Sequence, residues 1–212
     1  MQVLSVNVGQ VQAVSYQGER HQTGIFKQAV SGPVLIHSLG LAGDRVCDLF
    51  NHGGADKAVY AFSAHHHPYW QQALDSTELA PGAFGENLTV DQLDEGQICI
   101  GDQLRAGNAL LEVSQPRVPC FKLGIALGDE GAPALFTRYF HTGVYFRVLE
   151  EGTVCAGDPI EITHRHPQQL SVHALFRAFY DRDYPQRESL LRGAREIGEL
   201  AAEWQGKLRT RR

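Results

Sequence analysis

The chain has 212 residues, of which 43% are hydrophobic and 20% charged, and its formal net charge at pH 7 is −5. This near-average composition excludes a disordered, collagen-like or coiled-coil chain, and the negative charge argues against a dedicated nucleic-acid-binding protein. No apolar run approaches the roughly 20 residues of a membrane-spanning helix, and no secretory signal is recognisable. We therefore expect a cytoplasmic protein without nucleic-acid or membrane partners.

Residues 1–165 predict a β-rich unit built from short strands. Apolar runs at 3–8, 34–36, 98–104, 109–113, 144–149 and 160–162 are punctuated by glycines, a pattern typical of a β-barrel or a sandwich. Residues 66–74 and 129–139 predict helices between these strands. Neither a GxGxxG nor a P-loop sequence occurs, so the common nucleotide-binding fingerprints are absent.

After Pro167 the apolar spacing becomes helical. Ser171 is a predicted N-cap, Pro185 can open a second helix, and apolar residues recur at 197, 200, 201, 204 and 208. Residues 170–212 therefore predict a small three-helix domain after a main domain at 1–165. Its nine Lys and Arg outnumber its six Asp and Glu, but a basic end complements the dipole of the last helix and requires no nucleic acid.

The first candidate site segment runs from Gly43-Asp44-Arg45 through His52-Gly53-Gly54 to Lys57. Paired glycines allow a tight turn whose N–H groups face a ligand, and Lys57 adds a positive charge. Together they could hold a phosphate. The alternative is an ordinary loop with a solvated lysine, and the segment taken alone favours that alternative.

The second segment is Phe84-Gly85-Glu86-Asn87-Leu88. Its amide and carboxylate groups could hydrogen-bond a heterocycle. The alternative is a polar turn that enters a strand, and without other information this is the simpler interpretation.

The third segment, Ser114-Gln115-Pro116-Arg117-Val118-Pro119-Cys120, follows the strand predicted at 109–113. Two prolines stiffen it. Arg117 and Lys122 lie close to Cys120 in sequence, and nearby cations lower the pKa of a thiol. A thiolate binds soft metals or attacks electrophiles. The alternative is a buried structural cysteine, but the stiff cationic setting favours a functional one.

The other cysteines and the histidines carry weaker signals. Cys47, Cys99 and Cys155 form no CxxC pair and no zinc spacing, and we expect reduced thiols that serve mainly as core residues. Cys47 lies beside the Gly43–Arg45 turn and is the one of the three that could also face the cleft. Three consecutive histidines at 65–67 predict a solvated helix start, because consecutive side chains do not converge on one ion.

The three segments, in this order and followed by three helices, closely resemble MOSC-domain proteins of the YiiM type. The resemblance covers nearly the whole chain. It implies a MOSC β-barrel that binds the molybdenum cofactor, a pterin dithiolene with a terminal phosphate. It also implies a molybdenum-dependent oxidoreductase that detoxifies N-hydroxylated base analogues such as 6-N-hydroxylaminopurine. Electrons would come from a separate flavoprotein, since the sequence has no flavin, haem or iron–sulfur motif.

Site residues follow from the resemblance, position by position. Cys120 matches the molybdenum ligand and is the predicted catalytic residue. The implied cofactor-binding residues are Arg45, His52, Gly53, Gly54, Lys57, Asn87, Ser114, Arg117 and Arg147. Cations and turn N–H groups would hold the phosphate, while Asn87 and Ser114 would hydrogen-bond the pterin edge. Six residues should therefore line one cleft, namely Arg45, His52, Lys57, Asn87, Arg117 and Cys120.

Two other functions stay open on the residues alone. The chain could be a non-catalytic carrier of the molybdenum cofactor or of persulfide sulfur, since the same cysteine would serve. It could also be a plain β-barrel module that binds a small ligand. In each case the three helices offer a contact either to the electron donor or to a second copy of the chain in a homodimer. Pyridoxal phosphate is not expected as a cofactor.

Overall fold

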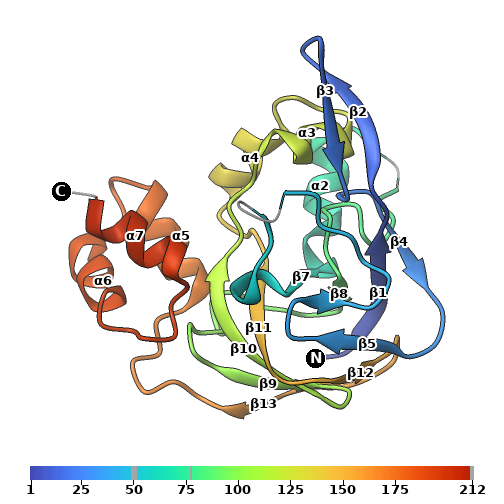
Figure 1. The fold of residues 1–212 in the computed structure, drawn as a ribbon. Helices are drawn as coiled ribbons and strands as arrows, with labels where there is room; N and C mark the ends of the chain where they lie inside the picture. Colours follow the sequence, from blue (N-terminus) through green and yellow to red (C-terminus); the bar gives the residue numbers. More distant parts are fainter. Residues whose placement is uncertain (49–51, 77, 211–212) are drawn as a thin grey trace.

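The structure is a computed structural model and describes residues 1–48, 52–76 and 78–210. Its centre is a large sheet, mainly antiparallel, in which only β7 and β8 run parallel (Figure 1). In spatial order this eight-stranded sheet comprises β13 (Ile160–His164), β9 (Gln103–Ala106), β10 (Ala109–Pro116), β11 (Val144–Glu150), β7 (Val59–Ser63), β8 (Leu88–Val90), β1 (Val3–Gly9) and β4 (Lys27–Val30). The predicted β-rich architecture is therefore confirmed.

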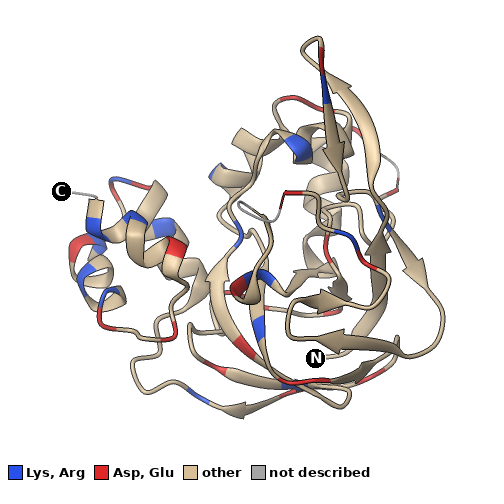
Figure 2. Ribbon diagram, in the orientation of Figure 1, with Lys and Arg blue, Asp and Glu red and all other residues tan. Residues whose placement is uncertain are grey.

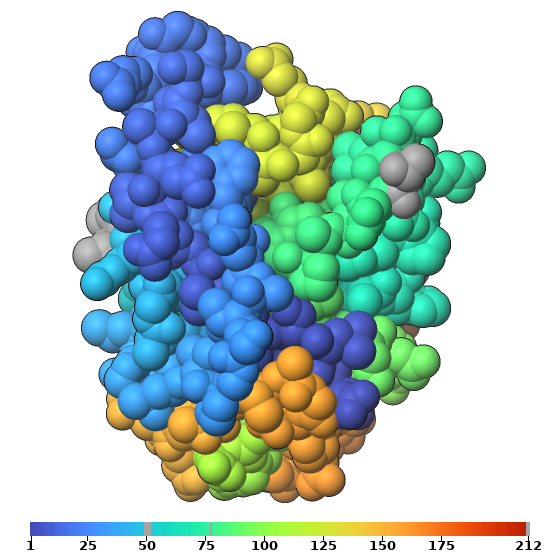
Figure 3. Space-filling view, turned by 90° about the vertical axis from the view of Figure 1, so that its right-hand side faces the viewer, coloured from blue at the N-terminus to red at the C-terminus, as the bar shows by residue number. Residues whose placement is uncertain are grey.

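Two smaller sheets complete the strands. One consists of β12 (Gly152–Val154), β5 (Val34–His37) and β6 (Gly40–Leu41), and the other is the hairpin of β2 (Gln12–Tyr16) and β3 (Glu19–Thr23). The hairpin stands out from the rest of the surface (Figure 3). The sequence analysis did not predict this hairpin, because its strands are polar and mostly exposed and give no apolar alternation.

A closed barrel is not confirmed. Within the described ranges, no strand ladder joins the edge strands β13 and β4. The two sides of the sheet meet instead through an isolated antiparallel bridge between Gln2 and Pro159, next to β1 and β13. A closed barrel would need a full ladder between β1 and β13. The free edge of β1 is instead paired with β4. The architecture is thus a mixed α/β arrangement of one large sheet and six described helices.

Three helices pack against one end of the sheet: α2 (His67–Ala73), α3 (Phe121–Leu127) and α4 (Ala132–Tyr139). The short 3-10 helices η1 (Ala55–Lys57) and η2 (Ala64–His66) flank β7. Trp70, Phe84 and Phe136 join strand residues in a buried aromatic cluster beneath these helices. The sequence analysis predicted α2 and α4 but not α3, whose seven residues are too few for a clear periodicity.

The last three helices, α5 (Val172–Tyr180), α6 (Arg187–Ala194) and α7 (Ala202–Thr210), lie together on one side of the sheet (Figure 1). Ser171 caps α5 by accepting a hydrogen bond from the Ala174 N–H at 3.2 Å, as predicted. Lys and Arg are spread over this group, between acidic residues (Figure 2). Their buried apolar residues continue the core of the large sheet, so the division into two domains stays a prediction. None of the described helices is long and apolar enough to span a bilayer.

Two predicted elements begin later than expected. The strand predicted from residue 98 begins at Gln103, because only Cys99 forms a bridge before it. The last helix was predicted over 197–208 and begins at Ala202. Ile197 and Leu200 are nevertheless buried. In both segments the apolar residues before the element are buried in turns and not in a strand or helix.

The turn before β8 is built around the buried carboxylate of Glu86. Its Oε1 accepts hydrogen bonds from the Gly82 N–H and the Thr89 hydroxyl, both at 2.7 Å, and Oε2 accepts one from the Phe84 N–H at 3.0 Å. Gly85 has a φ of +78°, and a Cβ there would lie 2.8 Å from the Ile25 side chain. These constraints fix the backbone that leads into Asn87 and the strand after it.

Replacing Glu86 by alanine is expected to lower the free energy of unfolding by about 2–4 kcal/mol, because two buried N–H groups lose their acceptor. Denaturant titration of the cofactor-free protein measures this change. Glu130→Ala is the matched control, since Glu130 is exposed, and it should change stability by less than about 0.5 kcal/mol. Similar effects of the two substitutions would contradict the structural role of Glu86.

Candidate functional site

A cavity of about 430 Å³ lies where the three sequence segments meet. The predicted convergence is confirmed, because six residues far apart in sequence line it: Arg45, His52, Lys57, Asn87, Arg117 and Cys120. A second cavity of about 460 Å³ shares His52, Lys57 and Cys120 with the first. Cys120 therefore lies where the two cavities adjoin and can face a ligand in either.

Cys120 lies just before α3, at the end of the loop that follows β10. Its Sγ is 3.3 Å from His52 Nε2, and Nδ1 of the same ring is 3.3 Å from Asp48 Oδ2. Burial raises the pKa of the Cys120 thiol, but the hydrogen bond with His52 and the charge of Arg117 outweigh it and bring the pKa to about 7. Near neutral pH a large share of this thiol is therefore thiolate.

This pKa predicts selective alkylation in the cofactor-free protein. The Cys120 rate with iodoacetamide should rise with pH and be half-maximal near pH 7, since the thiolate is the reactive form. Burial raises the pKa of Cys99 to about 11, so Cys99 should stay at least about 100-fold less reactive at pH 7. Mass spectrometry of each cysteine peptide measures both rates. Replacing His52 by glutamine should move the Cys120 midpoint to higher pH, and an unmoved midpoint would contradict the pairing.

Arg117 is the cation best placed to receive an anion. Its side chain is 6% exposed, and its guanidinium lies over the rings of Tyr60 and Phe136 at 5.0 and 5.2 Å from their centroids. Within the described residues, the buried Nη1 atom has no hydrogen-bond partner. A buried donor without an acceptor is costly, so a phosphate or another anion in the cavity would satisfy a group that the protein leaves open.

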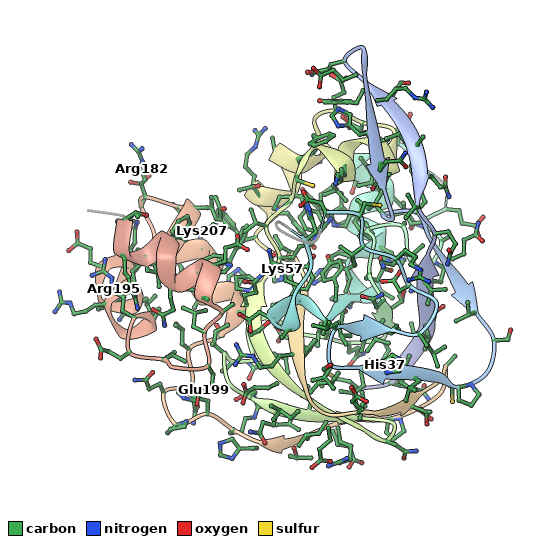
Figure 4. The ribbon with its side chains drawn as sticks, in the orientation of Figure 1. His37, Lys57, Arg182, Arg195, Glu199 and Lys207 are labelled. Atoms are coloured by element: carbon green, nitrogen blue, oxygen red, sulfur yellow. The ribbon has the colours of Figure 1, made fainter. Side chains whose placement is uncertain are left out.

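Lys57 also lines the cavity, but its charge is already paired. Its Nζ lies 2.5 Å from Glu203 Oε2 on α7, and Figure 4 shows Lys57 on the side of the sheet that faces the C-terminal helices. Lys27, which the sequence analysis did not single out, is likewise held by Asp44 at 2.5 Å. Of these three cations, Arg117 is therefore the one whose charge is least taken up by a carboxylate.

Several predicted cofactor-binding residues do not face the cavity. Ser114 is fully buried and donates its hydroxyl to the Asp56 carbonyl at 2.5 Å. Arg147 forms ion pairs with Asp56 at 2.7 Å and with Glu112 at 2.8 Å, and it lines neither cavity. Gly53 and Gly54 line neither cavity. In the part of the chain that the structure describes, none of these four residues lines either cavity, so their role in cofactor binding stays a prediction.

Asn87 does line the cavity, but its side chain holds the surrounding backbone. Its Oδ1 accepts a hydrogen bond from the Tyr60 N–H at 3.1 Å, and its Nδ2 donates to Asp44 Oδ2 at 2.9 Å. Asp44 in turn accepts from the Gly9 N–H at 2.7 Å. The polar groups of Asn87 thus position three strands around the cavity, and direct hydrogen bonding to a pterin stays a prediction.

The sequence model of the MOSC-domain family matches residues 48–161, more than half of the chain, and this segment contains His52, Arg117 and Cys120. The chain belongs to the MOSC-domain family. It is 36% identical over 165 residues to Protein YiiM of Escherichia coli, an alignment that covers 76% of this chain and 72% of that protein. It is therefore a MOSC-domain protein of the YiiM type, as the sequence analysis predicted.

Two further relatives extend this assignment. The crystal structure of YiiM from Geobacillus stearothermophilus has a TM-score of 0.82 and 31% identity, and the match covers 99% of this chain and 98% of that one. The shared fold thus includes the three C-terminal helices. A protein named Reductase from Gibberella moniliformis is 34% identical over 173 residues, which are 80% of this chain but 30% of that protein. This MOSC chain corresponds to one part of that longer protein.

Sequence reasoning missed several residues of the site in this MOSC chain. Asp48 stands four residues before His52 and is its ion-pair partner, a spacing that could have suggested the pair. Tyr145 and Glu203 line the second cavity, but they come from β11 and α7, and nothing in the sequence places those elements beside Cys120. Cys47 was not missed, since its position beside the Gly43–Arg45 turn predicted that it could face the cleft, and it does line the first cavity.

Proposed function

We propose that this protein binds the molybdenum cofactor in the cavity at Cys120 and reduces N-hydroxylated compounds, such as 6-N-hydroxylaminopurine and related base analogues. One observation carries the proposal: a thiol with a pKa of about 7 and a buried guanidinium with an unpartnered nitrogen line the same cavity. Membership of the MOSC family and a relative named Reductase support it.

The residues present fit this cofactor at both of its ends. The thiolate of Cys120 is a soft ligand of the kind that molybdenum accepts beside dithiolene sulfurs. Arg117 offers its open Nη1 to the terminal phosphate, where charge-assisted hydrogen bonds are strongest. Arg45 and Lys122 add positive charge to the lining. When bound, the cofactor supplies a two-electron redox centre.

The reduction breaks the N–O bond of the substrate, consumes two electrons and two protons, and releases the amine and water. The electrons would come from a separate flavoprotein. His52 is placed to hold a proton at Nε2 beside Cys120, since Asp48 pairs with its other ring nitrogen. The substrate would enter the second cavity, where Tyr145 and Phe121 offer aromatic surfaces. Gln115 lines that cavity, and its buried Oε1 has no partner within the described residues, so this oxygen can accept a substrate N–H.

Metal and pterin analysis of protein purified from cofactor-producing cells tests the first half of the proposal. About one molybdenum and one pterin per chain are expected. Turnover of 6-N-hydroxylaminopurine with reduced methyl viologen tests the second half, because this artificial donor replaces the flavoprotein. Cofactor without turnover would indicate the carrier function instead. Purified protein without molybdenum or pterin would contradict the proposal and leave a carrier of persulfide sulfur or a small-ligand binding module.

A further inference from the structure

Three side chains of types that can ligate a metal, His66, Glu95 and His141, form a cluster that shares no cavity with Cys120. Glu95 Oε2 is 3.1 Å from His66 Nε2 and 3.1 Å from His141 Nδ1, and the three ligand atoms all lie within 4.8 Å of one another. The sequence analysis assigned residues 65–67 to a solvated helix start. This is wrong for His66, which is 7% exposed, because its partners come from distant loops rather than from neighbouring histidines.

Each of these three side chains has a further contact that fixes its orientation. Glu95 is 1% exposed, and its Oε1 accepts a hydrogen bond from the Gly143 N–H at 3.0 Å. His66 Nδ1 is 3.1 Å from the Tyr139 hydroxyl. The ring of His141 stacks on that of His173 with centroids 4.8 Å apart. Contacts of this kind orient metal ligands in proteins, where a ligating imidazole usually hydrogen-bonds through its other nitrogen.

Two members of the cluster, His66 and His141, line a further cavity, while Glu95 lies behind them. This cavity, of about 490 Å³, is lined by His66, His141, Tyr139 and neighbouring residues, and it shares no lining residue with the two cavities at Cys120. The His141 side chain is 30% exposed, so an ion could reach the cluster from solvent. Three protein ligands beside an open space are the arrangement of zinc sites that keep a position for water or another ligand.

We propose that His66, Glu95 and His141 bind a divalent transition-metal ion, and that zinc suits this donor set best. Ligand atoms around a tetrahedral zinc ion lie roughly 3.3 Å apart, given zinc–ligand bonds of about 2.0–2.1 Å. Both distances to Glu95 already match this value, and only the two imidazoles need to approach each other. The open side of the ion would take water or an anionic oxygen ligand. This inference does not depend on the proposed reductase function.

The alternative is a cluster held by hydrogen bonds alone. In that case both imidazoles donate an N–H to Glu95 Oε2, and protons occupy the positions that the metal would take. Burial alone would raise the pKa of Glu95, but hydrogen bonds from His141 and His66 outweigh it and hold the pKa at about 2. Glu95 is thus a carboxylate in either state, and direct metal binding has to distinguish the two.

Cobalt(II) provides that test, since it occupies zinc sites and reports its coordination by visible absorption. The full chain carrying Cys120→Ser is titrated with Co²⁺ and then with Zn²⁺, so that the Cys120 thiolate cannot supply the signal. We expect one equivalent of Co²⁺ with intense bands of four- or five-coordinate geometry, no thiolate charge-transfer band, and displacement by Zn²⁺.

Variants then assign the ion to the cluster. In the same background, Glu95→Gln and His141→Ala should each weaken Co²⁺ binding at least 10-fold, while the matched control His164→Ala, an exposed histidine on β13, should retain it. Thermal unfolding checks that each variant folds, and the partly exposed His141 makes its variant the safer one. Absence of the visible bands, or unchanged binding in folded His141→Ala, would establish a hydrogen-bonded cluster only.

Discussion

Replacing Cys120 by serine is expected to abolish the reduction of N-hydroxylated substrates. Serine has nearly the same shape, but its hydroxyl is a hard and weakly acidic ligand that binds molybdenum poorly. We expect turnover with reduced methyl viologen to fall by about 100-fold or more, a loss of roughly 2.7 kcal/mol in transition-state stabilisation. The cations of the cavity are untouched, so part of the cofactor should remain bound. Parallel measurement of molybdenum content separates loss of turnover from loss of cofactor.

The other thiols supply the controls. Cys155 hydrogen-bonds Asp158 at 3.3 Å and lines neither cavity, so Cys155→Ser should retain full turnover. Cys47 is the rival, because it lines the same cavity as Cys120. If Cys120→Ser retains wild-type turnover with full molybdenum loading, thiolate ligation by Cys120 is wrong, and Cys47→Ser becomes the next variant to measure.

The sequence predicted the site's location better than its contacts. Short apolar runs between glycines mark buried strands whatever their partners, and for this reason β1, β5, β10, β11 and β13 were each anticipated. The three polar segments follow or precede such strands, so their convergence in one cavity could be expected once the family pattern was recognised. Whether the sheet closes depends on which strand occupies the edge beside β1, and no local pattern reports that.

The contacts of single residues depend on the fold in the same way. Arg147 was predicted to bind phosphate, but the register of β10 and β11 sets it directly opposite Glu112, and a cross-strand ion pair takes up its charge. Lys57 is paired by Glu203 of α7, a partner 146 positions away. Conversely, the sequence cannot show that Nη1 of Arg117 lacks a hydrogen-bond partner, because this depends on the residues that surround it in the fold. Residue type and spacing identify cations, whereas the fold decides which of them remain available to a ligand.

Replacing Arg117 by methionine is therefore expected to separate cofactor binding from folding. Arg117 is buried over two aromatic rings, so alanine would leave a void. Methionine fills most of that volume without charge. Losing the charge-assisted hydrogen bonds to the phosphate should weaken cofactor retention by about 10- to 100-fold, the equivalent of roughly 1.4–2.7 kcal/mol.

Folding of the cofactor-free protein should respond differently to the same substitution. The variant loses the cation–π contacts with Tyr60 and Phe136 but no longer buries a charge with an unpartnered nitrogen, and replacing buried charges by apolar groups of similar volume is often neutral or stabilising. We expect its unfolding free energy to stay within about 1 kcal/mol of wild type. Arg138→Met, at an exposed position on α4, is the control for removing one positive charge. Full molybdenum and pterin occupancy in Arg117→Met would show that the phosphate binds elsewhere, because no other described lysine or arginine of the cavity has a buried donor left open.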